Sequence, residues 1–336
     1  MHVQWFAHLP GVQLETEMSS HDVLEGKVKH LSFFEWCELD PSFPDSEASY
    51  TASQPVFYIG SASLEGDLKA VLKQVSDRLS RFYRALLLDS RVPWLPDPQL
   101  SVHYVRVNLP TGVATYRLVG PFEREWIVYG NRIVYSFDES AMRALGAVYE
   151  LLPDQESGGM LPAIEAGIET LVRTAKPDAW WDQRGIQLIN DFIHCTGALE
   201  KLLVPETNGA EEIKVAPAFG EHAAVLVNKS RDSLTELAGS YSGLYRLRSN
   251  LVHGYMTVAD LSDADQQVLR LGRILLREIL IKSLALNKYT NGHKQGDEAS
   301  HTNGQVSLAY MLKKAFEDDA FHQKMHSRLR DVEAIV

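Results

Sequence analysis

The stretch Leu244-Tyr245-Arg246-Leu247-Arg248-Ser249-Asn250-Leu251-Val252-His253-Gly254 gathers two arginines, a serine, an asparagine and a histidine at the end of one predicted helix. Upstream, from Phe219 to Tyr245, apolar residues recur at helical spacing, which predicts a long helix. Gly254 stands where a left-handed residue ends a helix, because glycine adopts a positive φ without steric cost. His253 is therefore expected in the last turn.

The spacing of these polar residues decides which of them share a face. On an ideal helix Arg246, Asn250 and His253 fall at i, i+4 and i+7, and Ser249 lies one turn before His253. Arg248 is five residues from His253, on the order of 140° around the helix axis. Arg248 and His253 can therefore converge through a distorted helix end, through a long arginine reaching over, or through a second copy of the helix.

These residues carry a resemblance to a known family. The run from Arg248 to His253 resembles the signature of the HEPN domains, in which an arginine and a polar residue precede a histidine by a short spacer. The fuller run from Leu244 to Gly254 is similar to the Apea-like HEPN branch. The earlier segments Asp191-Phe192-Ile193 and Ala198-Leu199-Glu200-Lys201-Leu202-Leu203 are also typical of that branch. The resemblance covers residues 180–290.

The resemblance implies an all-α bundle and a metal-independent endoribonuclease whose site assembles from two motif helices across a homodimer or pseudo-dimer. Arg248 and His253 would be catalytic, with Tyr245, Arg246, Ser249 and Asn250 in support. Histidine can take the proton of a ribose 2′-hydroxyl or give one to the leaving oxygen, and arginine stabilises the phosphorane charge. The expected products are a 2′,3′-cyclic phosphate and a 5′-hydroxyl, with no metal and no other cofactor.

Other interpretations of the same residues stay open. His253 can be a capping histidine that binds only the last carbonyls of its own helix, and Arg248 can be the partner of a structural ion pair. Arg270, Arg273 and Arg277 lie at i, i+3 and i+7 of the next predicted helix and form a basic stripe. The stripe is either a solvated face or a surface for the RNA backbone, and in both cases Arg270 and Arg273 are expected to be exposed.

Composition limits the class of protein. A net charge of −11 argues against RNA binding over the whole surface, so RNA would need a local basic patch. The two cysteines, Cys37 and Cys195, give no disulfide framework. The sequence has neither a signal-peptide pattern at its start nor an apolar run near the roughly 20 residues that span a bilayer. These features predict a cytoplasmic protein with no membrane segment.

The chain of 336 residues is long enough for two domains, and its patterns predict an α+β fold. We expect a β-rich α+β domain over 1–137, an all-α HEPN-type bundle over 138–290, and a linker with a C-terminal helix over 291–336. Strands are expected at 3–9, 28–37, 55–59, 102–109 and 114–119, with a hairpin of 126–129 and 132–135 turning at Gly130-Asn131. Helices are expected after a cap at Ser63, at 139–152, 162–174 and 180–203, from a cap at Ser262 to 286, and at 306–331.

Three functions follow from these features. The first is a ribonuclease of antiviral defence or of a toxin-like system, with the N-terminal domain as a sensor and a possible partner protein from the same system. The second is a non-catalytic HEPN module for dimerisation or RNA binding. The third is a ligand-binding or nucleotide-binding module unrelated to RNA. An intact Arg248 and His253 favour the first function, and the acidic net charge favours the other two.

Overall fold

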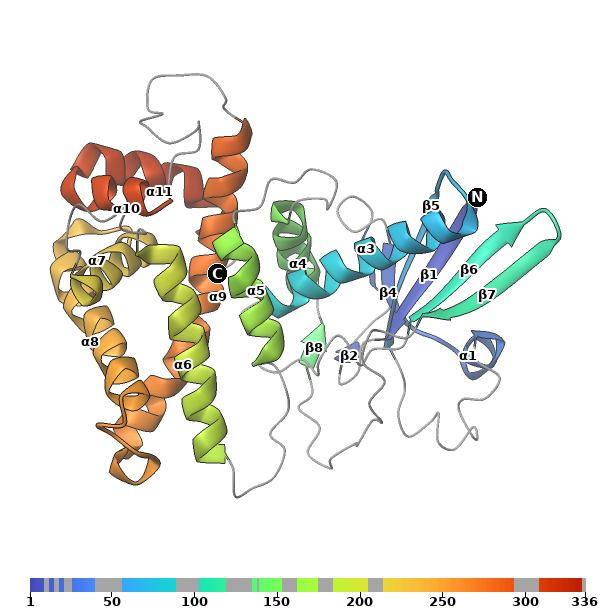
Figure 1. Cartoon of the computed structure of the whole chain (residues 1–336). Helices are drawn as coiled ribbons and strands as arrows, with labels where there is room; N and C mark the ends of the chain where they lie inside the picture. The colour runs from blue at the N-terminus through green and yellow to red at the C-terminus, as the bar shows by residue number, and fades with distance from the viewer. Residues whose placement is uncertain are drawn as a thin grey trace. The chain divides into compact units, whose positions relative to one another are not determined.

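The computed structural model describes residues 1–8, 12–14, 18–20, 26–39, 56–88, 103–118, 135–137, 139–152, 162–174, 184–204, 214–292 and 308–333 (Figure 1). The chain forms two compact units, one of residues 1–155 with 175–177 and one of residues 156–174 with 178–336. The first unit holds the sheet, and the described part of the second is helical. The predicted α+β class is confirmed.

The first unit is built on an antiparallel sheet. Among the described residues its strand order is β3-β4-β5-β1-β6-β7. These strands are β3 (Met18–Ser20), β4 (Gly26–His30), β5 (Val56–Ser63), β1 (His2–His8), β6 (His103–Leu109) and β7 (Gly112–Leu118). A parallel pair joins β2 (Val12–Leu14) to β8 (Tyr135–Phe137). The predicted hairpin at Gly130-Asn131 lies outside the described residues.

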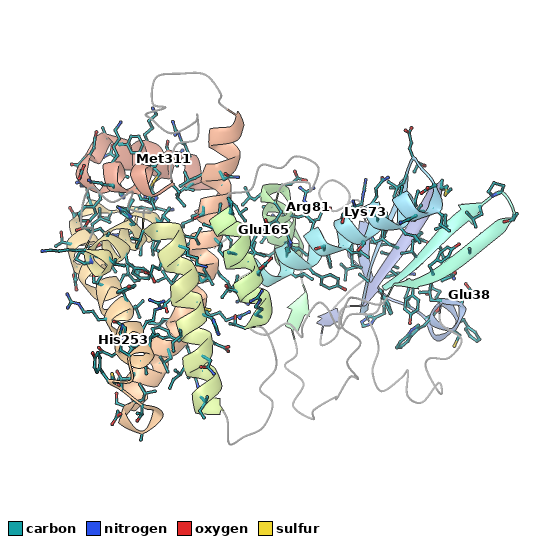
Figure 2. All side chains as sticks on the ribbon, in the orientation of Figure 1. Glu38, Lys73, Arg81, Glu165, His253 and Met311 are labelled. Atoms are coloured by element: carbon teal, nitrogen blue, oxygen red, sulfur yellow. The ribbon has the colours of Figure 1, made fainter. Side chains whose placement is uncertain are left out.

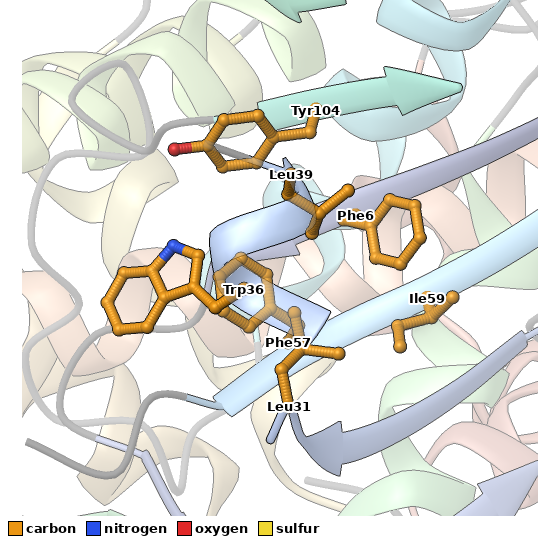
Figure 3. Packing of buried hydrophobic residues seen from close by; sticks show 7 residues of the cluster. All are labelled: Phe6, Leu31, Trp36, Leu39, Phe57, Ile59 and Tyr104. Carbon is orange, nitrogen blue, oxygen red and sulfur yellow. The ribbon is translucent and has the colours of Figure 1, made fainter. Parts of the chain in front are cut away.

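Alternation along the strands gives the sheet two apolar faces, because successive side chains of a strand point to opposite sides. On one face Tyr58 of β5 stacks on Phe82 of helix α3 (Leu68–Leu88), with ring centres 4.2 Å apart. On the other face Phe57 meets Trp36 of helix α1 (Phe33–Leu39) edge to face. Figure 3 shows the buried cluster around this second contact: Phe6, Leu31, Trp36, Leu39, Phe57, Ile59 and Tyr104.

Two elements of this unit differ from the expectation. The strand expected at 28–37 is strand β4 followed by helix α1, because Ser32 and Glu35 form a capping box. The Glu35 amide donates to Ser32 Oγ at 3.2 Å, and the Ser32 amide donates to Glu35 Oε2 at 2.8 Å. Helix α3 is capped by Asp67 rather than Ser63, since Asp67 Oδ1 accepts from the Ala70 amide at 2.8 Å. In both places a carboxylate, that of Glu35 or of Asp67, accepts a hydrogen bond from a backbone amide and sets where the helix begins. The spacing of apolar residues did not predict these positions.

The division between the units falls later than residue 137, because helix α4 (Glu139–Leu151) belongs to the first unit. Arg81 of α3, labelled in Figure 2, holds this helix. Its Nε donates to the Tyr149 carbonyl at 3.1 Å, and its guanidinium lies 4.2 Å from the centre of the Tyr149 ring. The helical spacing of apolar residues predicts a helix, but it does not show against which hydrophobic core that helix packs.

The second unit contains helices at most of the expected places. They are α5 (Pro162–Arg173), α6 (Arg184–Leu203), α7 (Val215–Val227), α8 (Leu234–Val252), α9 (Asp263–Gly292), α10 (Leu308–Glu317) and α11 (Asp319–Glu333). Helix α9 begins as predicted at Ser262, whose Oγ accepts from the Asp265 amide at 3.2 Å. In the described part of the chain, no helix combines the length and the apolar composition that crossing a bilayer needs.

Two helices predicted as continuous are broken by polar turns. The helix expected from Phe219 is interrupted after α7, where the side chain of Asn228 donates through Nδ2 to the Ser230 carbonyl and to Ser233 Oγ. The final helix expected at 306–331 is divided into α10 and α11 at Asp318. The Oδ1 of Asp318 accepts hydrogen bonds from the backbone amides of Ala320 and Phe321 in the first turn of α11. Asn and Asp side chains compete with the helical backbone for hydrogen bonds, and here they end one helix and start the next.

Helices α7 and α8 approach each other closely at Gly220. A Cβ placed on this residue would overlap the Ala238 carbonyl oxygen and Ser242 Oγ of α8. Ser242 Oγ also lies 2.9 Å from the Ala216 carbonyl of α7 and 2.7 Å from the Ala238 carbonyl of its own helix. Glycine is therefore required at position 220 by the distance between the two backbones, and this contact fixes the position of α8.

We predict that Gly220→Ala destabilises the fold by about 1–3 kcal/mol, because the added methyl must push the α8 backbone away. Gly239→Ala is the matched control on α8, since a Cβ at position 239 meets nothing within 4 Å. It should stabilise the fold by about 0.5–1 kcal/mol, the usual helix preference of alanine over glycine. Urea denaturation of both variants measures the difference. Equal effects would mean that the α7–α8 approach does not constrain the fold.

Candidate functional site

The motif stretch ends helix α8 in a Schellman motif. The Tyr255 amide donates to the Asn250 carbonyl at 2.8 Å, and the Gly254 amide donates to the Leu251 carbonyl at 3.3 Å. Gly254 has φ +71°, the left-handed conformation predicted for it. His253 is the C-cap residue, with its amide donating to the Ser249 carbonyl at 3.0 Å. The backbone around His253 is thus held by hydrogen bonds on both sides.

His253 presents its side chain to solvent at the end of α8 (Figure 2). Its ring centre lies 6.0 Å from that of Tyr255, which is 78% exposed. Arg246 and Asn250 are exposed as well, in agreement with the face that the i, i+4, i+7 spacing predicts. The cap carbonyls are occupied by backbone amides, so the imidazole of His253 is not needed to satisfy them.

Arg248 faces in another direction, toward helix α6. Its Nη1 lies 2.8 Å from Glu200 Oε2, and the Tyr245 hydroxyl donates to Glu200 Oε1 at 3.2 Å. The Arg248 guanidinium also lies 5.6 Å from the centre of the Tyr245 ring. Burial and the neighbouring Glu200 carboxylate raise the pKa of the Tyr245 phenol, so this hydroxyl stays protonated and acts as the donor.

The structure therefore brings Arg248, Tyr245 and Glu200 together but leaves His253 apart from them. Among the described residues, no hydrogen bond or ion pair joins Arg248 to His253. Ser249 is half-buried, and its carbonyl supports the helix end. Within one copy of the chain, the spacing argument holds: α8 is a regular helix up to Val252, and the two motif residues lie on different sides of it.

The basic stripe on α9 is not an exposed surface. Arg270 is exposed, but Arg273 is half-buried and Arg277 is only 5% exposed. Arg273 Nη1 donates to Thr174 Oγ1 at the end of α5, and burial lowers the pKa of Arg273. The expectation that both Arg270 and Arg273 are exposed is wrong for Arg273. The seven-residue spacing placed the three arginines on one stripe of α9, but only Arg270 faces solvent, since Arg273 is half-buried and Arg277 is buried.

The adjacent His194 and Cys195 of α6 do not form a nucleophile and base pair. His194 is exposed, whereas Cys195 is fully buried and lies 3.9 Å from Thr174 Oγ1. Burial raises the pKa of the Cys195 thiol to about 11, so a reactive thiolate does not form near neutral pH. Cys195 of α6 and Arg273 of α9 both contact Thr174, so they lie together where α5, α6 and α9 meet.

Two residues of the site were missed by sequence reasoning. Glu200 appears in the HEPN-like segment of α6, but its contact with Arg248 spans 48 positions of the chain and no local pattern shows it. Tyr255 follows the motif directly, and an aromatic residue just after a C-terminal glycine could have been noticed as an exposed neighbour of His253. No group of three or more His, Cys, Asp or Glu side chains suited to a metal ion occurs among the described residues.

The chain was compared with protein-family models, with curated proteins and with solved structures, and none of them matches it.

We predict that Arg273→Ala destabilises the fold by about 1–3 kcal/mol, because it removes the hydrogen bond to Thr174 and a half-buried side chain between three helices. Arg270→Ala is the matched control on the exposed side of α9 and should change stability by less than about 0.5 kcal/mol. Thermal and urea unfolding test the pair. Equal stability of the two variants would show that Arg273 contributes nothing to the helix junction.

Proposed function

We propose that the chain is a metal-independent endoribonuclease of the HEPN type, with Arg248 and His253 as catalytic residues and with Tyr245, Arg246, Ser249 and Asn250 in support. The observation that carries this proposal is the end of helix α8. There an exposed histidine stands on a backbone held by a Schellman motif, five residues after an arginine whose guanidinium is paired with Glu200. A guanidinium held in one place can stabilise charge that develops in a transition state, and an exposed imidazole can accept or give a proton.

The proposed reaction is an intramolecular transesterification. His253 takes the proton of a ribose 2′-hydroxyl, and the 2′-oxygen forms a bond to the adjacent phosphorus. The bond from phosphorus to the 5′-oxygen breaks, and that oxygen takes a proton from a second histidine, which a second copy of the chain supplies. Arg248 donates hydrogen bonds to the non-bridging oxygens. The ends are a 2′,3′-cyclic phosphate and a 5′-hydroxyl, and every step is a proton transfer or a phosphoryl exchange.

The separation of Arg248 from His253 within one copy supports a homodimer. Arg248 points to α6 while His253 lies in solvent at the helix end, so a second motif helix is needed to bring an arginine and a histidine to one phosphate. We further propose that the protein works in the cytoplasm in antiviral defence or a toxin-like system. In this proposal the sheet unit is a sensor, and a partner protein of the same system is possible.

A second candidate is a non-catalytic HEPN module for dimerisation or RNA binding. The ion pair between Glu200 and Arg248 favours it, because a guanidinium already paired with a carboxylate attracts a phosphate less strongly. The burial of Arg277 also removes part of the expected basic surface. Cleavage and binding assays on the same variants separate the two candidates.

We predict that the protein cleaves RNA in the presence of EDTA and that His253→Ala and Arg248→Ala each reduce the rate at least about 100-fold, the usual contribution of general acid–base and charge-stabilising groups. End-group mapping should give 2′,3′-cyclic phosphates. His194→Ala and Lys201→Ala are the matched controls, since both residues are exposed on α6, and they should cleave like wild type. A 3′-hydroxyl product, or full activity of both motif variants, contradicts the mechanism.

We predict that the protein is a homodimer with twice the 37.7 kDa mass of the 336-residue chain. Light scattering measures the mass. In addition, an excess of the inactive His253→Ala protein should inhibit the wild type, because a mixed dimer lacks the second histidine that the proposed reaction needs. A wild-type monomer that cleaves RNA would rule out the composite site.

A further inference from the structure

The carboxylate of Glu200 makes two contacts to α8, one with each oxygen. Oε2 lies 2.8 Å from Arg248 Nη1, and Oε1 accepts from the Tyr245 hydroxyl at 3.2 Å. Tyr245 and Arg248 are three residues apart on α8, so they project from the same side of the helix. Glu200 therefore contacts the Arg248 guanidinium and the Tyr245 hydroxyl at the same time.

Glu200 stands where its own helix does not favour a carboxylate. It lies in the last turn of α6, which ends at Leu203, and the C-terminal end of a helix carries partial negative charge. The contact with Arg248 compensates for this position, because the guanidinium places a positive charge directly beside the carboxylate. The side chains of Arg248 and Glu200 are 22% and 30% exposed, so water screens their interaction only in part.

The guanidinium also lies near Gly197, one turn earlier on α6. A Cβ at Gly197 would lie 3.6 Å from Arg248 Nη2 and 4.0 Å from Nε, which is ordinary van der Waals contact. The guanidinium thus lies across α6 beside Gly197 and Glu200. Arg248 Nε is buried and has no hydrogen-bond partner among the described residues, so the position of this side chain is set by the contact to Nη1 and by the Tyr245 ring.

We infer that Glu200 is a positioning residue of the active site, which holds the Arg248 guanidinium in one orientation with the help of the Tyr245 hydroxyl. This inference rests on the proposed ribonuclease function. A long arginine side chain has many rotamers, and a carboxylate that accepts at Nη1 leaves the N–H groups of Nη2 for a phosphate. Glu200 does not touch the substrate but fixes the group that does.

The test compares Glu200→Gln, Tyr245→Phe and a control, Glu236→Gln, in the 336-residue chain. Glu236 is an exposed glutamate in the first turn of α8, far along the helix from Arg248. Glu200→Gln keeps the size of the side chain and removes its charge, and we expect its kcat to fall about tenfold or more, with KM for RNA changed less than about twofold. Tyr245→Phe should give a smaller loss, and Glu236→Gln none.

An activity-independent measurement reports on the same contact. With ¹⁵N-labelled arginine, assigned through Arg248→Lys, a held guanidinium shows separate Nη signals because rotation about its Cζ–N bonds is slow. We expect separate signals in the wild type and in Glu236→Gln, and merged signals in Glu200→Gln. Thermal unfolding curves show whether each variant is still folded at the assay temperature. A loss of activity in a variant that has unfolded at that temperature is not evidence about Glu200.

The outcomes separate this inference from the proposed function. If the wild type cleaves RNA but Glu200→Gln has unchanged or higher kcat, Glu200 does not position Arg248 and the inference fails while the function stands. If the wild type cleaves no RNA, the function fails, and Glu200 as a catalytic positioning residue fails with it, even where the Nη signals remain separate. Merged Nη signals in the wild type overturn the inference whatever the activity.

Discussion

The close approach of α7 and α8 at Gly220 is the contact on which the motif helix depends. The Ala238 carbonyl and Ser242 Oγ fill the space where any other residue at position 220 would place its Cβ. Ser242 adds hydrogen bonds to carbonyls of both helices, which keeps a polar group satisfied inside the contact. With α8 fixed in this way, the direction of each side chain in its last turns follows from helix geometry.

Polar contacts around α7 tie the rest of the helical unit to this pair. His222 of α7 makes a short hydrogen bond with the Leu203 carbonyl at the end of α6, and burial lowers the pKa of His222. At the other end of α7, Lys282 of α9 donates to the Val227 carbonyl at 3.2 Å, and His326 of α11 lies 2.8 Å from the Val225 carbonyl. Side chains from three helices therefore satisfy the carbonyls at helix ends, as buried backbone groups require.

Local features of the fold could be predicted from the sequence, and long-range ones could not. The left-handed Gly254 and the cap at Ser262 depend on residues within a few positions, and both occur as expected. The break at Asn228 and the capping box of Ser32 and Glu35 are equally local, but strong apolar patterns on either side hid them. The sheet order, with β1 between β5 and β6, depends on pairings between distant segments.

The candidate site shows the same limit. Spacing alone showed that Arg248 and His253 diverge on a regular helix, and the structure agrees with that. Spacing could not show that Glu200 forms an ion pair with Arg248, because the two residues come from different helices. Nor could it show that Arg273 and Arg277 face the helix junction, since a stripe of arginines looks the same on a buried face and on a solvated one.

The use of arginines inside the fold constrains how an acidic chain could bind RNA. Arg248 is paired with Glu200, Arg231 with Asp319, and Arg106 with Glu38. Each pair cancels a positive charge that would otherwise attract phosphate, on a chain whose net charge is already −11. In the proposed ribonuclease, the positive potential must therefore be concentrated where two copies of α8 meet, with the exposed Arg246 and His253 of both chains around one phosphate. The same dimer that completes the catalytic residues would then also supply the electrostatic attraction that a single copy lacks.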